Sequence, residues 1–129
     1  MGYSLPAAMG AKIGCPDRQV VAVCGDGAFQ MSMMELATMV QHKVAVKMVV
    51  LNNKLLGMVR EYQHYTYHDQ YSVVDLSGSP KLECIAAAYD IDYLHLQNME
   101  QCDQVIAELL KDDRSVLLEC DIDPMDLVK

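Results

Sequence analysis

Short apolar runs alternate with segments of helical periodicity along this chain. Residues 20–24 and 46–51 are almost continuously apolar, which is typical of parallel strands buried on both faces of a sheet. Between them, residues 30–42 place Leu36 and Val40 on one helical face. A strand, a helix and a second strand in this order predict a parallel βαβ unit.

The alternation continues in the second half of the chain. Residues 80–90 and 98–113 have helical periodicity, whereas residues 91–97 and 115–123 have the composition of short strands. We therefore predict an α/β fold in which helices cover both faces of a doubly wound, mostly parallel sheet. The length of 129 residues fits a single domain.

Two helix starts are predicted from capping residues. Ser4 is expected to cap a first helix, with Pro6 tolerated in its first turn and Pro16 beyond its end. Asn98 is expected to cap the helix over residues 98–113, because Gln101 follows it at the spacing of a capping box.

The predicted helix over residues 30–42 is apolar nearly all round. Met31 and Met34 lie toward a different face from Leu36 and Val40. A helix of this kind is buried on both sides, so we expect a protein interface against the face that the sheet does not cover. Packing within the local core is the alternative.

Two polar segments need an interpretation of their own. Tyrosine and histidine are concentrated in residues 62–71, and aromatic and polar side chains together are typical of a loop that folds over a binding site. A solvated or interface aromatic segment is the alternative. Near the end of the chain, we interpret His95 as structural, and Asp121 and Asp123 as solvated charges after the last strand.

Composition excludes several classes of function. The net charge of −8 argues against binding to nucleic acid, which attracts basic surfaces. No apolar run reaches the roughly 18 residues of a membrane span, and no signal peptide is visible. The five cysteines show neither a metal-binding spacing nor a disulfide framework. A cytoplasmic globular domain is the expectation.

Candidate chemistry follows the first two predicted strands. A Gly-Asp-Gly sequence comes after the first strand and an asparagine pair after the second, so Asp26 and Asn53 are expected to meet at one edge of the sheet. Carboxylate and amide oxygens suit Mg²⁺, which is usually shared with the phosphates of a ligand. Gly25 and Gly27 allow the backbone to approach a phosphate, and N–H groups of the helix starting near Phe29 would point toward it.

These motifs carry a resemblance to a known family. Gly-Asp-Gly followed after roughly two dozen residues by Asn-Asn resembles the signature of thiamine-diphosphate-dependent enzymes. The sequences MGYSLPAAMGAK, GDGAFQMSMMELATMV and LNNKLLGMV are similar to the catalytic subunit of acetolactate synthase (acetohydroxyacid synthase). The resemblance covers essentially all of residues 1–129, but only the C-terminal, diphosphate-binding domain of that family. We therefore expect a fragment or a separate subunit of a longer enzyme.

The resemblance implies roles for individual residues. Asp26, Asn53 and the backbone carbonyl of Leu55 would bind Mg²⁺, and Met58 would flank the reacting carbon of the cofactor. Tyr62 would share the substrate pocket with Met58, and it stands where acetolactate synthases commonly carry tryptophan, which leaves the choice between pyruvate and 2-oxobutyrate as acceptor open. The candidate cofactor-binding residues are Met1, Gly2, Gly25, Gly27, Ala28, Phe29 and Met58.

The resemblance also implies an activity and partners. Acetolactate synthases use thiamine diphosphate and Mg²⁺ to decarboxylate pyruvate and ligate it to a second 2-oxo acid, and they hold FAD in another domain. The activating glutamate lies on a pyrimidine-binding domain of the same or another chain. No catalytic residue is therefore expected here, and we predict a homo-oligomer that is inactive without that domain. The alternatives are a subunit of another split thiamine-diphosphate-dependent 2-oxo acid decarboxylase or oxidoreductase, and a non-catalytic binding module.

Overall fold

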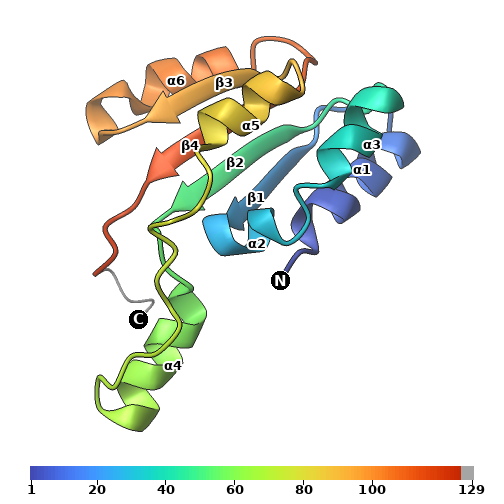
Figure 1. Ribbon diagram of the computed structural model, residues 1–129. Helices are drawn as coiled ribbons and strands as arrows, with labels where there is room; N and C mark the ends of the chain where they lie inside the picture. The colour runs from blue at the N-terminus through green and yellow to red at the C-terminus, as the bar shows by residue number, and fades with distance from the viewer. Residues whose placement is uncertain (126–129) are drawn as a thin grey trace.

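A four-stranded parallel sheet forms the centre of the computed structural model, which describes residues 1–125 (Figure 1). The spatial order of the strands is β1-β2-β4-β3, and every neighbouring pair is parallel. The predicted α/β fold with a parallel sheet is confirmed. The strands are β1 (Val21–Gly25), β2 (Lys47–Asn52), β3 (Asp92–Leu96) and β4 (Val116–Asp121).

Helices cover both faces of this sheet, as predicted, but unevenly. On one face α1, α3 and α5 pack against β1, β2 and the middle of β4, and α6 lies on the other face over β3 and β4 (Figure 1). The helices are α1 (Ser4–Gly14), α2 (Asp26–Gln30), α3 (Glu35–Gln41), α4 (Gly57–Tyr67), α5 (Leu82–Ala88) and α6 (Cys102–Leu109), with a 3-10 turn at Met99–Gln101.

The larger core lies between the sheet and α1, α2, α3 and α5. Phe29 and Leu36 are fully buried there, next to Leu5, Met48 and Leu117. Full burial of an aromatic or aliphatic side chain contributes roughly 1.5–3 kcal/mol. This core fixes the position of α2, which begins directly at the end of β1.

The opposite face is covered only over β3 and β4. There Leu109 of α6 packs against Leu118. Over β1 and β2, by contrast, Val21, Val23 and Leu51 are exposed to solvent. An apolar sheet face of this kind is normally covered in a complete protein.

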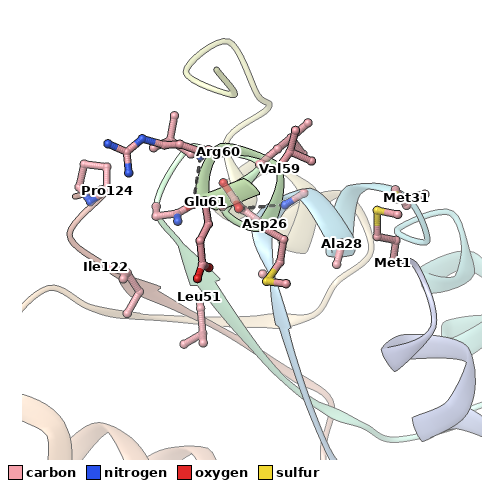
Figure 2. Close-up of a pocket in the computed structure, with 17 residues that line it drawn as sticks. Met1, Asp26, Ala28, Met31, Leu51, Val59, Arg60, Glu61, Ile122 and Pro124 are labelled. Carbon is pink, nitrogen blue, oxygen red and sulfur yellow. Dashed lines mark hydrogen bonds between the residues drawn. The ribbon is translucent and has the colours of Figure 1, made fainter. Parts of the chain in front are cut away.

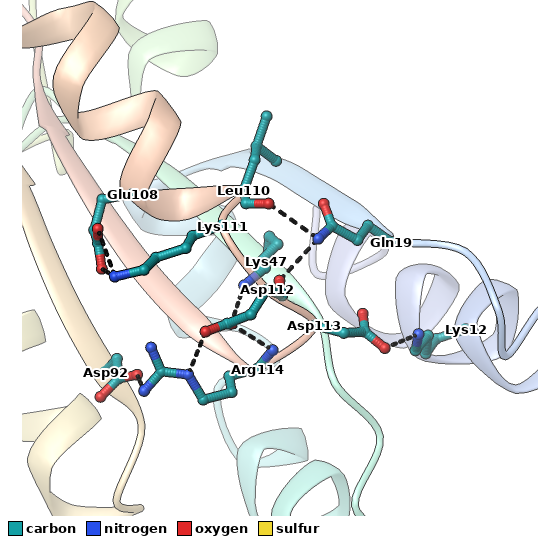
Figure 3. Close-up of polar contacts among 10 residues, drawn as sticks. All are labelled: Lys12, Gln19, Lys47, Asp92, Glu108, Leu110, Lys111, Asp112, Asp113 and Arg114. Atoms are coloured by element: carbon teal, nitrogen blue, oxygen red, sulfur yellow. Dashed lines mark hydrogen bonds and ion pairs between the residues drawn. The ribbon is translucent and has the colours of Figure 1, made fainter.

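The amino end of the sheet is held by buried lysines (Figure 3). Lys12 donates to Asp113 Oδ2 at 2.6 Å, and Lys47 Nζ lies 3.6 Å from Asp112 Oδ1. Gln19 donates to the Asp112 carbonyl at 2.8 Å. Hydrogen bonds from Arg114 to the Asp112 carboxylate lower its pKa to about 2. The loop before β4 is therefore tied to α1 and β2, at the end of the sheet opposite Asp26.

The central helical segment differs from the prediction. The single helix expected over residues 30–42 is two helices, α2 and α3, because hydrogen bonds from Ser32 N to Phe29 O and from Glu35 N to Ser32 O form turns between them. Met31 and Met34 are exposed, so the alternative, packing of this face within the local core, is wrong, and the interface with further protein stays a prediction.

The predicted loop over residues 62–71 is also wrong. Most of it belongs to α4, which projects away from the sheet (Figure 1). The helix ends at Tyr67, and the C-cap residue His68 adopts a left-handed conformation with φ 50°. The following turn bonds back to the helix, since Gln63 and Ser72 exchange two hydrogen bonds and His64 contacts Asp69.

Neither predicted cap is formed by the expected side chain. Tyr3 is the N-cap residue of α1, and Ser4 lies inside the helix with its hydroxyl buried and without a partner among residues 1–125. The side chain of Asn98 makes no capping hydrogen bond, and a 3-10 turn precedes α6. In the described part of the chain, no helix is long and apolar enough to cross a membrane.

Candidate functional site

The ends of β1 and β2 bring Asp26 and Asn53 to the same edge of the sheet, as predicted. Gly25 pairs in register with Leu51, so both strands end at the same level. Gly25 is extended with ψ 160° and serves as the N-cap residue of α2, in which Asp26 is the first residue. The side chains of Asp26 and Asn53 line one pocket.

Asp26 is a buried carboxylate that the chain satisfies only in part. Its exposed fraction is 5%, and Oδ1 accepts a hydrogen bond from Gly27 N at 2.9 Å. Oδ2 is buried and has no partner among residues 1–125. Burial raises the pKa of the Asp26 carboxyl, and the nearby backbone N–H groups, that of Gly27 foremost, only partly oppose this. Because an unpaired buried charge is costly, this oxygen is suited to a bound cation.

The asparagine pair shapes the loop after β2. Asn52 Oδ1 accepts from Lys54 N at 3.1 Å, and Asn53 Oδ1 accepts from Leu55 N at 3.0 Å. Lys54 has φ 57°, which turns the chain back toward the site. Leu56 N then donates to the Val74 carbonyl at 2.8 Å. These bonds hold Leu55, the third predicted metal ligand, at the wall of the pocket.

Gly27 marks a close approach of three chain segments. A Cβ atom at this position would lie 2.8 Å from Leu56 Cδ2 and 3.2 Å from Leu76 Cδ1. The absence of a side chain therefore lets the loops after β2 and α4 close against the start of α2.

Most of the predicted site residues surround a single pocket of about 490 Å³ (Figure 2). Apolar side chains dominate its wall, and Asp26 provides a buried charge. The pocket is lined by eight of the residues that the sequence singled out: Met1, Gly25, Asp26, Gly27, Ala28, Asn53, Leu55 and Met58.

Three predicted site residues do not line this pocket. Phe29 is fully buried in the core, so its side chain has a packing role. Gly2 has φ 66° and lies against Met31. Tyr62 on α4 is 60% exposed and is not part of the pocket wall.

Sequence reasoning missed several residues of the wall. Arg60 and Glu61 follow Met58 on α4, and Ile122 and Pro124 follow β4. Glu61 could have been predicted from helical spacing, because it stands three residues after Met58. Ile122 and Pro124 line the pocket because β4 lies beside β2, an order that the sequence does not reveal.

The oxygen atoms at this edge fit Mg²⁺ bound to a phosphorylated ligand. The free Asp26 oxygen supplies charge, and an amide oxygen and a backbone carbonyl are available at Asn53 and Leu55. Mg²⁺ takes few protein ligands and shares the rest of its coordination with water and phosphate. Gly27 lines the pocket and has no side chain, so a phosphate can approach its backbone closely.

We expect Asp26→Asn to stabilise the metal-free chain at neutral pH. The folded state holds the Asp26 proton to higher pH than the unfolded chain does, because its pKa is raised. Stability from this group is thus complete below about pH 3.8 and lost as the pH rises through the raised pKa. Urea denaturation should show a gain over the wild-type chain at pH 7 that shrinks toward acid.

The exposed Asp17 provides the matched control. Asp17→Asn should change the free energy of unfolding by no more than about 0.5 kcal/mol at either pH. An Asp26→Asn chain that is less stable than the wild type at pH 7 would contradict the claim that the ionised Asp26 carboxylate destabilises the metal-free fold.

We expect Gly27→Val to lower the free energy of unfolding by roughly 1–3 kcal/mol, because Leu56 and Leu76 must both move. Gly10→Val on α1 is the control, since no atom lies within 4 Å of a Cβ there. Chemical denaturation measures both. Equal stability of the two variants would show that the contact at Gly27 is loose.

Comparisons with known proteins show the family of this chain. The family model described as thiamine pyrophosphate enzyme, C-terminal TPP binding domain, matches residues 1–120. The acetolactate synthase large subunit of Porphyra purpurea is 37% identical over 123 residues, covering 95% of this chain and 21% of that protein. The acetolactate synthase isozyme 2 large subunit of Escherichia coli is 35% identical over 128 residues, covering 99% of this chain and 23% of the relative.

A solved structure shows the same fold. The thiamine diphosphate-dependent 4-hydroxybenzoylformate decarboxylase of Rhodococcus jostii superposes with a TM-score of 0.84 at 26% identity, covering 96% of this chain and 24% of that one. The chain thus spans about a fifth to a quarter of the length of these relatives. It belongs to the thiamine pyrophosphate enzyme family, as a C-terminal TPP-binding domain.

Proposed function

We propose that this chain forms the Mg²⁺-diphosphate half of the thiamine diphosphate site of an acetolactate synthase. The observation that carries the proposal is the buried, unpartnered Oδ2 of Asp26 in the same pocket as Asn53. Acetolactate synthase large subunits from several organisms match nearly the whole chain, which supports this choice within the family.

Each part of the pocket has a separate task in this proposal. Asp26, Asn53 and the carbonyl of Leu55 hold Mg²⁺, and the backbone at Gly25, Gly27 and Ala28 accommodates the diphosphate. Met1 and Met58, which both line the pocket, provide apolar contacts for the rings of the cofactor and the 2-oxo acid.

When bound, thiamine diphosphate would supply the carbon nucleophile and electron sink for decarboxylating one 2-oxo acid and joining it to another. The chain's own contribution is binding, orientation and exclusion of water by the apolar wall. As the resemblance to acetolactate synthases implies, proton transfer falls to a glutamate on a pyrimidine-binding domain, so the chain alone makes no acetolactate.

The partner would be that domain on the same chain or another one, in a homo-oligomer. The exposed sheet face at Val21, Val23 and Leu51, together with Met31 and Met34, is consistent with further protein covering this domain. A subunit of a split 2-oxo acid decarboxylase is the second candidate, because the decarboxylase fold matches at TM-score 0.84.

Calorimetric titration of thiamine diphosphate into the chain tests the proposal. Binding should require Mg²⁺ and disappear with chelator. Asp26→Ala should weaken binding by at least about tenfold, or about 1.4 kcal/mol, because the metal loses its charged ligand. Asp17→Ala, which removes an exposed carboxylate, should leave binding unchanged.

Adding a pyrimidine-binding domain extends the same experiment. If the chain alone gives no heat, Mg²⁺-dependent binding that appears with the domain and is lost in Asp26→Ala would still support the half-site. Absence of binding in both arrangements would favour a non-catalytic module.

A further inference from the structure

A second group of polar side chains lies at the carboxyl end of the sheet, on β3 and β4. His95 pairs in register with Glu119, and Asp121 follows on the same face of β4. One ligand atom from each of these three residues lies within 4.8 Å of the other two. His95 Nε2 is 3.0 Å from Asp121 Oδ1. We call these three residues the His95 cluster.

Glu119 is held in place by two donors from neighbouring strands. Asn52 Nδ2 donates to its Oε1 at 2.5 Å, and the Tyr93 hydroxyl donates to its Oε2 at 2.6 Å. Such bonds orient a carboxylate and leave lone pairs of its oxygens available. The Glu119 side chain thus has a fixed orientation before any ion binds.

The charges of the cluster are not balanced by the chain. Within residues 1–125, neither Glu119 nor Asp121 pairs with a lysine or arginine, and His95 is the one basic group that contacts the Asp121 carboxylate. The side chains of His95 and Asp121 are 31% and 46% exposed. A cation can therefore reach the cluster from solvent and is attracted by its negative charge.

We propose that His95, Glu119 and Asp121 bind a divalent transition-metal ion such as Zn²⁺. An imidazole nitrogen with two carboxylates is a suitable donor set for Zn²⁺, whereas Mg²⁺ prefers oxygen ligands only. Ligand atoms around tetrahedral Zn²⁺ are about 3.3 Å apart, from bonds of roughly 2.0 Å. The separations here extend from 3.0 Å to within 4.8 Å, so small side-chain rotations complete the site.

This site is separate from the pocket at Asp26, since none of its three residues lines that pocket. The His95 cluster is nevertheless connected to the pocket at Asp26 through Asn52, which donates a hydrogen bond to Glu119 and directly precedes Asn53. An ion on the His95 cluster would tie the ends of β2, β3 and β4 together. Three protein ligands leave a coordination position for water.

Zn²⁺ titration into the metal-free chain tests this proposal, with Mg²⁺ present in excess to occupy oxygen-only sites. Wild-type chain should bind one equivalent that His95→Ala and Asp121→Asn each weaken by at least about tenfold. His42→Ala removes an exposed histidine outside the cluster and should bind as the wild type does. Tyr93→Phe should weaken binding through loss of the hydrogen bond that orients Glu119.

Free cysteines are the competing ligands, and Co²⁺ distinguishes them. Co²⁺ bound to the His95 cluster gives visible absorption without the thiolate-to-metal charge-transfer bands in the near ultraviolet. Binding that is unchanged in both His95→Ala and Asp121→Asn, that carries thiolate bands, or that is absent from the wild type would overturn the proposal. None of these outcomes depends on thiamine diphosphate.

Discussion

The buried carboxylate of Asp26 is the constraint around which this domain is arranged. Its position follows from the parallel register of β1 and β2, which end side by side at the same edge. Gly27 N donates to Oδ1, whereas Oδ2 has no donor among residues 1–125. A group held in this way costs stability in the free chain and is retained where a bound cation offsets the cost.

The two ends of the sheet differ in structure: ion pairs lie at the amino end and the pocket lies at the carboxyl end. At the amino end, ion pairs from Lys12 and Lys47 connect the loop before β4 to α1 and β2. At the carboxyl end, loops after β1, β2 and β4 enclose the pocket. The strands thus position the residues that line the pocket, while α4 projects from the sheet and part of the sheet face is exposed.

The central part of the site could be predicted from the sequence, because the positions of Asp26 and Asn53 follow from local sequence patterns. Two apolar runs, a Gly-Asp-Gly turn and an asparagine pair were enough to bring Asp26 and Asn53 together. Ile122 was missed because its place beside Asn52 depends on strand order, which no local pattern encodes. Helix α4 was missed because contacts such as Gln63 with Ser72 form only after the following turn folds back.

The most direct test of the account is a crystal structure of the chain, or of its complex with a pyrimidine-binding domain, grown with thiamine diphosphate and Mn²⁺ in place of Mg²⁺. Anomalous scattering locates the ion independently of the protein atoms. The account predicts an ion bound by Asp26, by Asn53 and by the carbonyl of Leu55, in contact with the diphosphate. An ion elsewhere, or a diphosphate bound while Asp26 remains without a cation, would contradict it.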